Sequence, residues 1–235
     1  ITAPGVLHIG AYDNNANYSW NGYLDEIRVS SGIARYTPSI ERYANTFVEK
    51  GDTGDAYTAL QIQSNGAKSG TGYTDSLNRT GYNTGASAGA KSIKWLSTGG
   101  DPLGGANTAL YFDGTVNTLT FADSADWDMV GNQAFTYEAW IRPEWDFSTT
   151  NVRFLVSHGG HGSTDVDGWS IDFDTANTRW FVRISSTIYN MTDVDNGMSQ
   201  GLWYHWIFTK DSSGYRVYRD GVLINAGTTV GHSTG

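Results

Sequence analysis

Three acidic side chains near the middle of the chain are the first candidates for chemistry: Glu138, Glu144 and Asp146. Retaining glycoside hydrolysis needs two carboxyl groups about 5 Å apart, one as the nucleophile and one as the acid. Pro143 separates the first carboxylate from the other two, and proline breaks the alternation of a strand. We therefore interpret the group as a solvated strand end and turn, and the sequence predicts a protein that is not an enzyme.

The five histidines are scattered along the chain, and two of them stand close together in His158-Gly-Gly-His161. Such a pair could chelate a metal from a loop, the alternative being an exposed loop with no ligand. His205 lies inside the strand-like segment WYHWIF, where we expect a packed or hydrogen-bonded imidazole. The sequence shows no Ser-His-Asp context, phosphate loop or nucleotide fingerprint.

Composition narrows the class of partner. The net charge of −9 and the pI of about 4.8 argue against nucleic acid and anionic membrane surfaces. The acidity fits an extracellular, carbohydrate-facing or calcium-using protein, and it equally fits solubility alone. The chain has no cysteine, which excludes disulfides and favours a bacterial or viral source. No apolar run of about 18 residues is present, so we expect no membrane insertion.

The elements that must position these residues are short strands. Residues 109–112 are an apolar run that ends at an Asp113-Gly114 turn, and residues 118–121 and 135–142 alternate between two faces. In residues 135–142 the alternation places Phe135, Tyr137, Ala139 and Ile141 on one face, and the remaining four residues on the other. This sequence of strand, hairpin, acidic loop and strand is typical of an antiparallel sandwich.

Other segments extend the same pattern. Residues 23–29 alternate, and the alternation places Asp25 on the side of Ile27 and Val29, where a bare carboxylate is costly. Seven short segments follow Pro143, and Asp220-Gly221 predicts a tight hairpin between the last two. Residues 37–56 have the composition of a linker. From Tyr57 a strand signal precedes a Gly-, Ser-, Thr- and Asn-rich loop that reaches Lys91, and we expect little helix.

Three parts of the chain carry recognisable motifs: ALYFDGTVNTLTFADSADWDM followed by AFTYEAWIRP, LWYHWIFTKDSSGYRVYRDGVLI, and NGYLDEIRVSSGIARYT. Together these motifs resemble the laminin-G-like, concanavalin-A-like jelly-roll family, with similarity to copies in bacteriophage structural proteins. The resemblance implies an all-β, antiparallel two-sheet jelly-roll sandwich. The fold hosts lectins, glycosidases, adhesion modules and inert spacers, so it does not by itself give a function.

The order of the motifs differs from that of the family, because the closing strands stand at the start of the chain. We interpret residues 1–43 as closing strands, 44–56 as a linker, and 57–235 as opening and central strands of a jelly roll. The order favours a permuted chain, one period of a tandem array, or a strand-exchanged frame that links copies of the chain into a fibre. The alternative is one ordinary domain. Residue 1 is Ile, which we interpret as a processed or cut chain. Residues 5–30 should pair with Leu110–Phe112 and Phe135–Ile141.

The resemblance also implies a structural Ca²⁺ at Asp25 and Asp113, with Asn117 where relatives often carry Asp. Hard cations take several oxygen ligands, and an amide oxygen can serve with lower affinity. The alternative is that Asp113 caps its own turn and Asp25 bonds backbone. The acidic stretch 123–128 and the pair Asp165 and Asp167 are weaker calcium candidates.

Sugar binding would use exposed aromatic rings beside polar groups at the rim of the sandwich. Trp145, Trp169 and Tyr189 lie near turns and are the candidates, whereas Trp127 could clamp the acidic loop to the core. We expect a non-enzymatic structural or adhesive repeat of an extracellular fibre, cell surface or virion appendage. The alternative is a calcium-assisted, lectin-like module that binds a cell-surface glycan.

Overall fold

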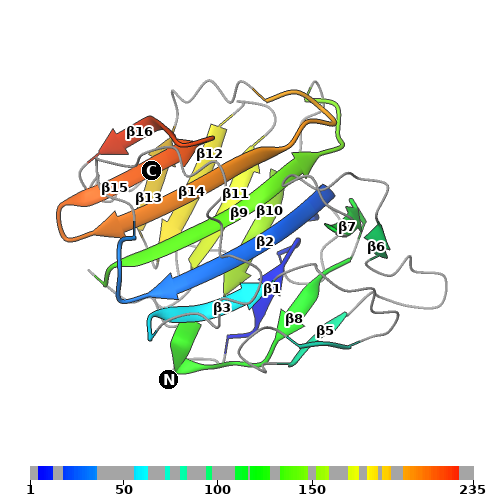
Figure 1. The fold of residues 1–235 in the computed structure, drawn as a ribbon, viewed down its shortest axis with the longest axis horizontal. Coiled ribbons are helices and arrows are strands. Elements are labelled where there is room, and N and C mark those ends of the chain that lie inside the picture. The colour runs from blue at the N-terminus through cyan, green and yellow to red at the C-terminus, as the bar shows by residue number, and fades with distance from the viewer. Residues whose placement is uncertain are drawn as a thin grey trace.

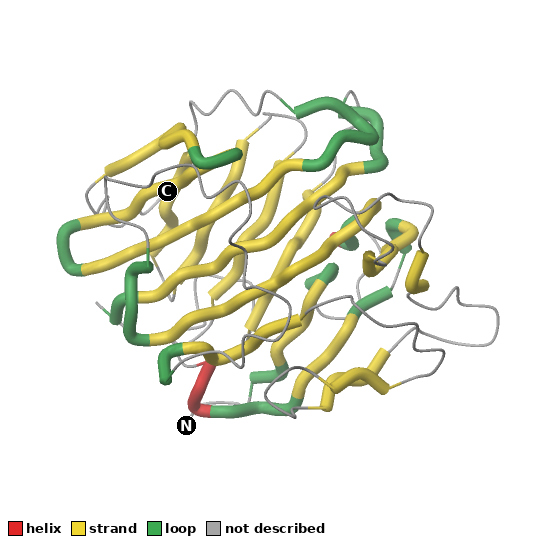
Figure 2. The backbone as a smooth tube through the Cα atoms, viewed as in Figure 1, coloured by secondary structure: helices red, strands yellow, loops and turns green. Residues whose placement is uncertain are grey.

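The computed structural model describes residues 5–12, 18–35, 56–62, 72–74, 80–83, 94–96, 109–115, 117–127, 133–147, 152–158, 169–174, 179–184, 187–191 and 198–227. Within these ranges the regular elements are strands, apart from one 3-10 turn, η3 (Ala125–Trp127), drawn red in Figure 2. None of the described residues forms a helix long and apolar enough to cross a membrane.

Two antiparallel sheets face each other (Figure 1). Sheet A has the order β13 (Thr187–Met191), β12 (Arg179–Ile184), β11 (Trp169–Asp174), β10 (Val152–His158), β1 (Leu7–Ile9), β8 (Leu119–Phe121), β5 (Thr80–Asn83), β4 (Gly72–Thr74). Sheet B has the order β16 (Val222–Gly227), β15 (Gly214–Arg219), β14 (Tyr204–Asp211), β9 (Phe135–Pro143), β2 (Asn21–Ser31), β7 (Ala109–Asp113), β6 (Lys94–Leu96), and β3 (Thr58–Ile62) also pairs with β2. The all-β two-sheet jelly roll is confirmed.

The first strands of the chain occupy the middle of both sheets. β2 pairs with β7, with Leu24 opposite Leu110, and with β9, with Leu24 opposite Ile141. β1 lies between β8 and β10 in sheet A. The expected pairing of residues 5–30 with the later strands is therefore confirmed, and it closes within one chain. The permuted frame itself stays an interpretation of the sequence, and residues 36–55, which include the expected linker except its last residue, lie outside the described residues.

A β-bulge in β2 reverses the face predicted for Asp25. Asp25 lies opposite Trp140, whereas Arg28 lies opposite Glu138, so β2 carries one extra residue over this interval. Glu26 absorbs it with a φ of 47°. Leu24, Ile27 and Val29 consequently all face the core, although Leu24 was predicted on the other side, and the prediction that Asp25 shares a face with Ile27 was wrong.

Two further expectations are corrected by the sheet topology. The Asp113-Gly114 turn does not close a hairpin, because β7 belongs to sheet B and β8 to sheet A. The chain crosses between the sheets here, and both Phe112 and Phe121 are buried in the core that the sheets share. The polar span before residue 91 is not loop throughout, since it contains β4 and β5, which pair with each other.

Alternation predicts β9 and the last hairpin correctly. The four residues of β9 predicted to share one face, Phe135, Tyr137, Ala139 and Ile141, are each 1% exposed or less and face the core. β15 and β16 are joined by Asp220 and Gly221, both with positive φ, at 50° and 76°. Two such residues make the type I′ turn that suits the twist of a hairpin.

Candidate functional site

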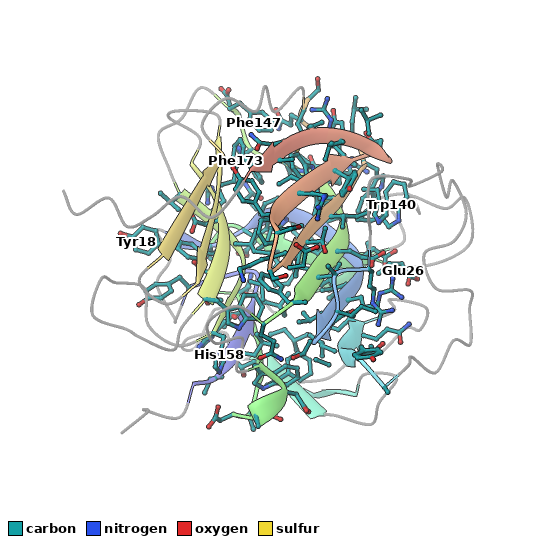
Figure 3. The ribbon with its side chains drawn as sticks, turned by 90° about the vertical axis from the view of Figure 1, so that its left-hand side faces the viewer. Tyr18, Glu26, Trp140, Phe147, His158 and Phe173 are labelled. Atoms are coloured by element: carbon teal, nitrogen blue, oxygen red, sulfur yellow. The ribbon has the colours of Figure 1, made fainter. Side chains whose placement is uncertain are left out.

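The outer face of sheet B carries polar and aromatic side chains in successive cross-strand rows. Arg142 and Trp140 of β9 project outward at one end, because their neighbours Ile141 and Ala139 face the core. Glu138 and Thr136 follow on the same face. Figure 3 labels Trp140 and Glu26 on this side of the molecule, away from His158 of sheet A.

The row nearest the end of the sheet consists of Tyr111, Tyr23, Arg142 and Trp203, and we call it the Tyr23 row. Tyr23 lies opposite both Tyr111 of β7 and Arg142 of β9. Its ring lies 4.9 Å from that of Tyr111 and 6.2 Å from that of Trp203, and the Arg142 guanidinium carbon is 5.1 Å from its centroid. Tyr111, Arg142 and Trp203 are each partly exposed.

Backbone features hold this row together. Gly22, at φ 141°, brings β2 close to β9, and a Cβ at this position would lie 2.2 Å from the Arg142 carbonyl oxygen. The loop before β14 is tied to the end of β9, since Gly201 donates its N–H to the Pro143 carbonyl over 2.8 Å. That contact places Trp203 beside the row.

The charge around the Tyr23 row is mixed. Arg142 forms an ion pair with Glu144, with 2.7 Å between Nε and Oε1. Burial, and then the neighbouring Tyr23, Asp113 and Glu144, raise the pKa of the Tyr111 phenol. The phenol therefore stays neutral at physiological pH, and the row offers aromatic faces flanked by one cation and two anions.

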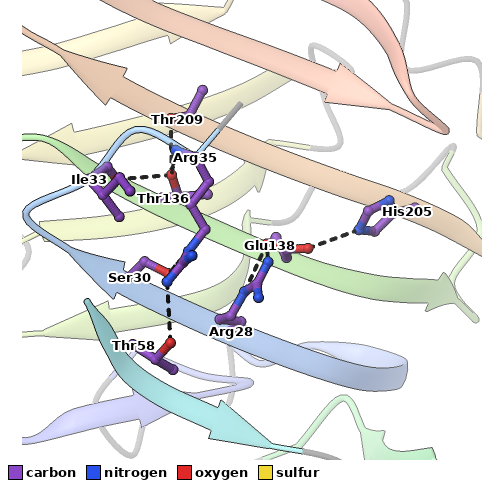
Figure 4. Close-up of polar contacts among 9 residues, drawn as sticks. All are labelled: Arg28, Ser30, Ile33, Arg35, Thr58, Thr136, Glu138, His205 and Thr209. Atoms are coloured by element: carbon purple, nitrogen blue, oxygen red, sulfur yellow. Dashed lines mark hydrogen bonds and ion pairs between the residues drawn. The ribbon is translucent and has the colours of Figure 1, made fainter. Parts of the chain in front are cut away.

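Further along the same face lies a buried ion pair (Figure 4). Arg28 donates two hydrogen bonds to Oε2 of Glu138, of 2.6 and 3.1 Å. The other carboxylate oxygen lies 3.6 Å from Nε2 of His205, whose ring stacks on Trp140 with 5.0 Å between centroids. His205 is thus packed, as expected, whereas the expectation that Glu138 is solvated was wrong, because it is fully buried.

The surroundings of the Glu138 carboxylate indicate a structural role. Glu138 is held by a guanidinium on β2, and the other two carboxylates of the predicted group lie beyond Pro143, where Glu144 pairs with Arg142. A second polar cluster continues the face: the Arg35 side chain donates to Ser30 and Thr58, and its backbone N–H donates to Thr136 (Figure 4). The segment after β2 is thereby fastened over sheet B.

Two of the three predicted calcium ligands lie on one connection, between β7 and β8. Asp113 Oδ1 accepts from the N–H and hydroxyl of Thr115, as its turn-capping alternative predicted, and its buried Oδ2 accepts no hydrogen bond within the described residues. The amide oxygen and nitrogen of Asn117 are also buried, and they too form no hydrogen bond within the described residues. Carboxylate and amide oxygens are ligand types that Ca²⁺ takes, so the chemistry of these two residues is compatible with the ion.

Asp25 does not belong to that set. Asn21 is the β2 residue opposite Asp113, and Asp25 lies four residues further on, about 13 Å along the strand. Its Oδ1 accepts the N–H of Glu26 instead, which stabilises the bulge. In the described ranges, no group of three or more His, Asp or Glu side chains is arranged to hold a metal ion.

The aromatic residues predicted to bind sugar have other positions. Trp145 and Trp169 are 3% and 2% exposed, and both belong to the core. Trp145 packs edge-on against Trp20 at 4.6 Å, so the expectation of an exposed ring was wrong for these two. Tyr189 lies in β13, opposite Val182, and its side chain is outside the described residues. Trp127 clamps its loop as expected, and its carbonyl accepts from the Trp169 indole at 2.7 Å.

Sequence reasoning missed the Tyr23 row. Its signal was present, because Tyr111 alternates with buried Leu110 and Phe112, and Arg142 alternates with buried Ile141. The prediction from proximity to a turn instead selected tryptophans that the sandwich buries. The sequence pattern does not show which strands pair, and that pairing is what aligns the residues of the row.

Comparison with known proteins agrees with this architecture. A family model described as the concanavalin A-like lectin/glucanases superfamily matches residues 113–235, just over half of the chain. No curated protein and no solved structure gives a significant match. The match begins at the end of β7, and the earlier strands pair with matched ones: β1 lies between β8 and β10, and β2 pairs with β9. The chain belongs to the concanavalin A-like lectin/glucanase superfamily.

Proposed function

We propose that this protein is a non-enzymatic, calcium-assisted carbohydrate-binding module whose binding surface is the Tyr23 row. The observation that carries the proposal is the alignment of Tyr111, Tyr23 and Arg142 across three neighbouring strands, with Trp203 beside them. Aromatic faces stack on the apolar faces of sugar rings, and the guanidinium and carboxylate provide hydrogen bonds to hydroxyl groups. A neutral glycan also suits a chain of net charge −9, because its binding requires no basic surface.

In this proposal calcium orders the loop beside the binding surface and does not itself bind the sugar. Asp113 follows Tyr111 by two residues on β7, so both project from the outer face of sheet B. A Ca²⁺ held by Asp113 Oδ2 and Asn117 Oδ1 would fix the β7–β8 connection and hence the edge of the Tyr23 row. The ion would offset the negative charge of Asp113 and fix the positions of its ligands.

The location we propose is extracellular, on a cell surface or on a virion, where glycans are met. A glycan-binding unit there acts as an adhesive module, which joins the two functions expected from the sequence. Assembly of copies into a fibre stays a prediction from the order of the motifs.

A glycan array with the whole chain tests the proposal. We expect binding to a restricted set of glycans, weakened roughly tenfold or more by Trp203→Ala or Tyr111→Ala, the partly exposed rings of the row, since a central contact of this kind is worth about 1–2 kcal/mol. Tyr57→Ala is the matched control, because Tyr57 is an exposed tyrosine outside the row. Equal binding by all four proteins, or silence on the array with and without calcium, would refute the proposal.

A further inference from the structure

The loop before β14 exposes a large apolar side chain beside the Tyr23 row. Leu202 is 55% exposed, the highest value for a large apolar side chain in the described part of the chain. Both of its neighbours contact the row. A Cβ on Gly201 would lie 3.9 Å from the Arg142 guanidinium, and the Trp203 ring lies 6.2 Å from that of Tyr23. Leu202 therefore adds apolar surface at the border of the row.

Hydrogen bonds and one buried side chain fix the conformation of this loop. The Ser199 N–H donates to the Tyr204 hydroxyl over 2.7 Å, and the Gly201 N–H donates to the Pro143 carbonyl over 2.8 Å. Met198 anchors the start of the loop in the core, where it is 7% exposed. A loop that is already ordered loses little conformational freedom on binding, so its exposed side chains are preorganised for a ligand.

Gln200 presents a hydrogen-bond acceptor from the same loop. Its side chain is exposed, and its Nε2 donates to the Glu144 carbonyl over 3.0 Å. A carbonyl oxygen accepts and does not donate, so this bond places the amide nitrogen at Glu144 and leaves Oε1 at the other end of the amide. Glu144 also pairs with Arg142, so the Gln200 amide lies on the Arg142 side of the row.

We propose that the Tyr23 row and this loop recognise the acetamido group of an N-acetylated amino sugar, an inference that rests on the carbohydrate-binding function proposed above. An acetamido group combines an apolar methyl, an N–H donor and a carbonyl acceptor. Leu202 matches the methyl, Oε1 of Gln200 matches the N–H, and the Arg142 guanidinium matches the carbonyl. The sugar ring itself stacks on the aromatic side chains of the row.

This arrangement discriminates against a sugar that carries a hydroxyl in place of the acetamido group. The hydroxyl can still bond a polar side chain, but it supplies no methyl to cover Leu202. An apolar contact of this size changes affinity by about tenfold or more. The acetamido group is also neutral, which suits a row in which Arg142 is already paired with Glu144.

The glycan array and calorimetric titration of the whole chain together test the inference. On the array, we expect the bound glycans to contain N-acetylated amino sugars. The titration compares N-acetylgalactosamine with galactose, and N,N′-diacetylchitobiose with cellobiose, because the members of each pair differ only in acetamido groups that replace hydroxyls. We expect the acetylated member of at least one pair to bind about tenfold or more tightly.

Two variants of exposed residues assign this preference to the loop. Leu202→Ser and Gln200→Met should each reduce the ratio of the two affinities by roughly threefold or more, with little change for the sugar that lacks acetamido groups. The matched control is Leu223→Ser, which removes a leucine of β16 that is 48% exposed and should leave the ratio unchanged.

The outcomes separate this inference from the proposed function. Equal affinity for both members of each pair, with binding that Tyr111→Ala weakens, would overturn the acetamido assignment and leave the carbohydrate-binding function standing. A ratio that stays unchanged in both Leu202→Ser and Gln200→Met would also overturn it. An array on which no glycan binds would overturn the inference and the proposed function together.

Discussion

Replacing Arg28 with methionine should strongly destabilise the fold, because it removes the guanidinium from a carboxylate that water cannot reach. Glu138 is fully buried, and Arg28 supplies both hydrogen bonds to its Oε2. Breaking a buried pair by removing one partner costs about 3–5 kcal/mol. His205 lies 3.6 Å from the other oxygen and can compensate in part, so we expect the lower end of that range, about 3 kcal/mol.

Urea unfolding followed by tryptophan fluorescence measures this loss, and a thermal melt should fall by about 6–12 °C for a chain of this size. The matched control is Arg216→Met. Arg216 also pairs with a carboxylate, that of Asp211 at 3.2 Å, but both side chains are partly exposed. An exposed pair contributes about 1 kcal/mol or less, so the control should change stability only slightly.

The double variant Arg28→Met, Glu138→Leu separates the two causes of destabilisation. If the cost of Arg28→Met comes from an uncompensated buried charge, removing that charge should restore most of the lost stability. Two results would refute the reasoning: a loss below about 1 kcal/mol in the single variant, or a double variant that is less stable than the single one.

Two other predictions concern ions and pH. Calcium at a hundredfold excess over its dissociation constant should raise the thermal midpoint of the wild type by about 5–10 °C. The same rise is expected in Asp146→Ala, a control that removes an exposed carboxylate, but not in Asp113→Ala. No rise in the wild type would contradict the calcium site. The Ser213 hydroxyl, then its backbone N–H and Arg216, lower the pKa of Asp211, with burial opposing them. The folded-state pKa thus lies below the unfolded one, so this carboxylate stabilises the fold above about pH 4, and that contribution disappears as the pH falls through the folded-state pKa. Ser213→Ala should flatten the melting temperature between about pH 4 and pH 2, and an unchanged profile would contradict the assignment.

Alternation and turn residues along the chain predicted most of the strands and one complete hairpin, whereas the jelly roll was implied by the family resemblance and the polar strands β4 and β5 were not predicted. The residues of β9 that share a face could be assigned one by one, because side chains in a regular strand point alternately to the two faces. Asp220-Gly221 predicted its turn because both positions require positive φ. These features depend on neighbours in sequence, and the sequence contains them fully.

Tertiary structure decided which side chains meet and which are covered. A single positive φ at Glu26 changed the parity of β2 and moved Asp25 to the outer face, which no periodicity could predict. Trp145 and Trp169 lie near turns in sequence, yet the sheets close over them, because burial depends on the packing of distant strands. The same pairing aligned Tyr23 with Tyr111 and Arg142, and brought Asp123 to His158. The sequence by itself determined the residue types of the proposed binding site, and its assembly required the registers of strands that are far apart in the chain.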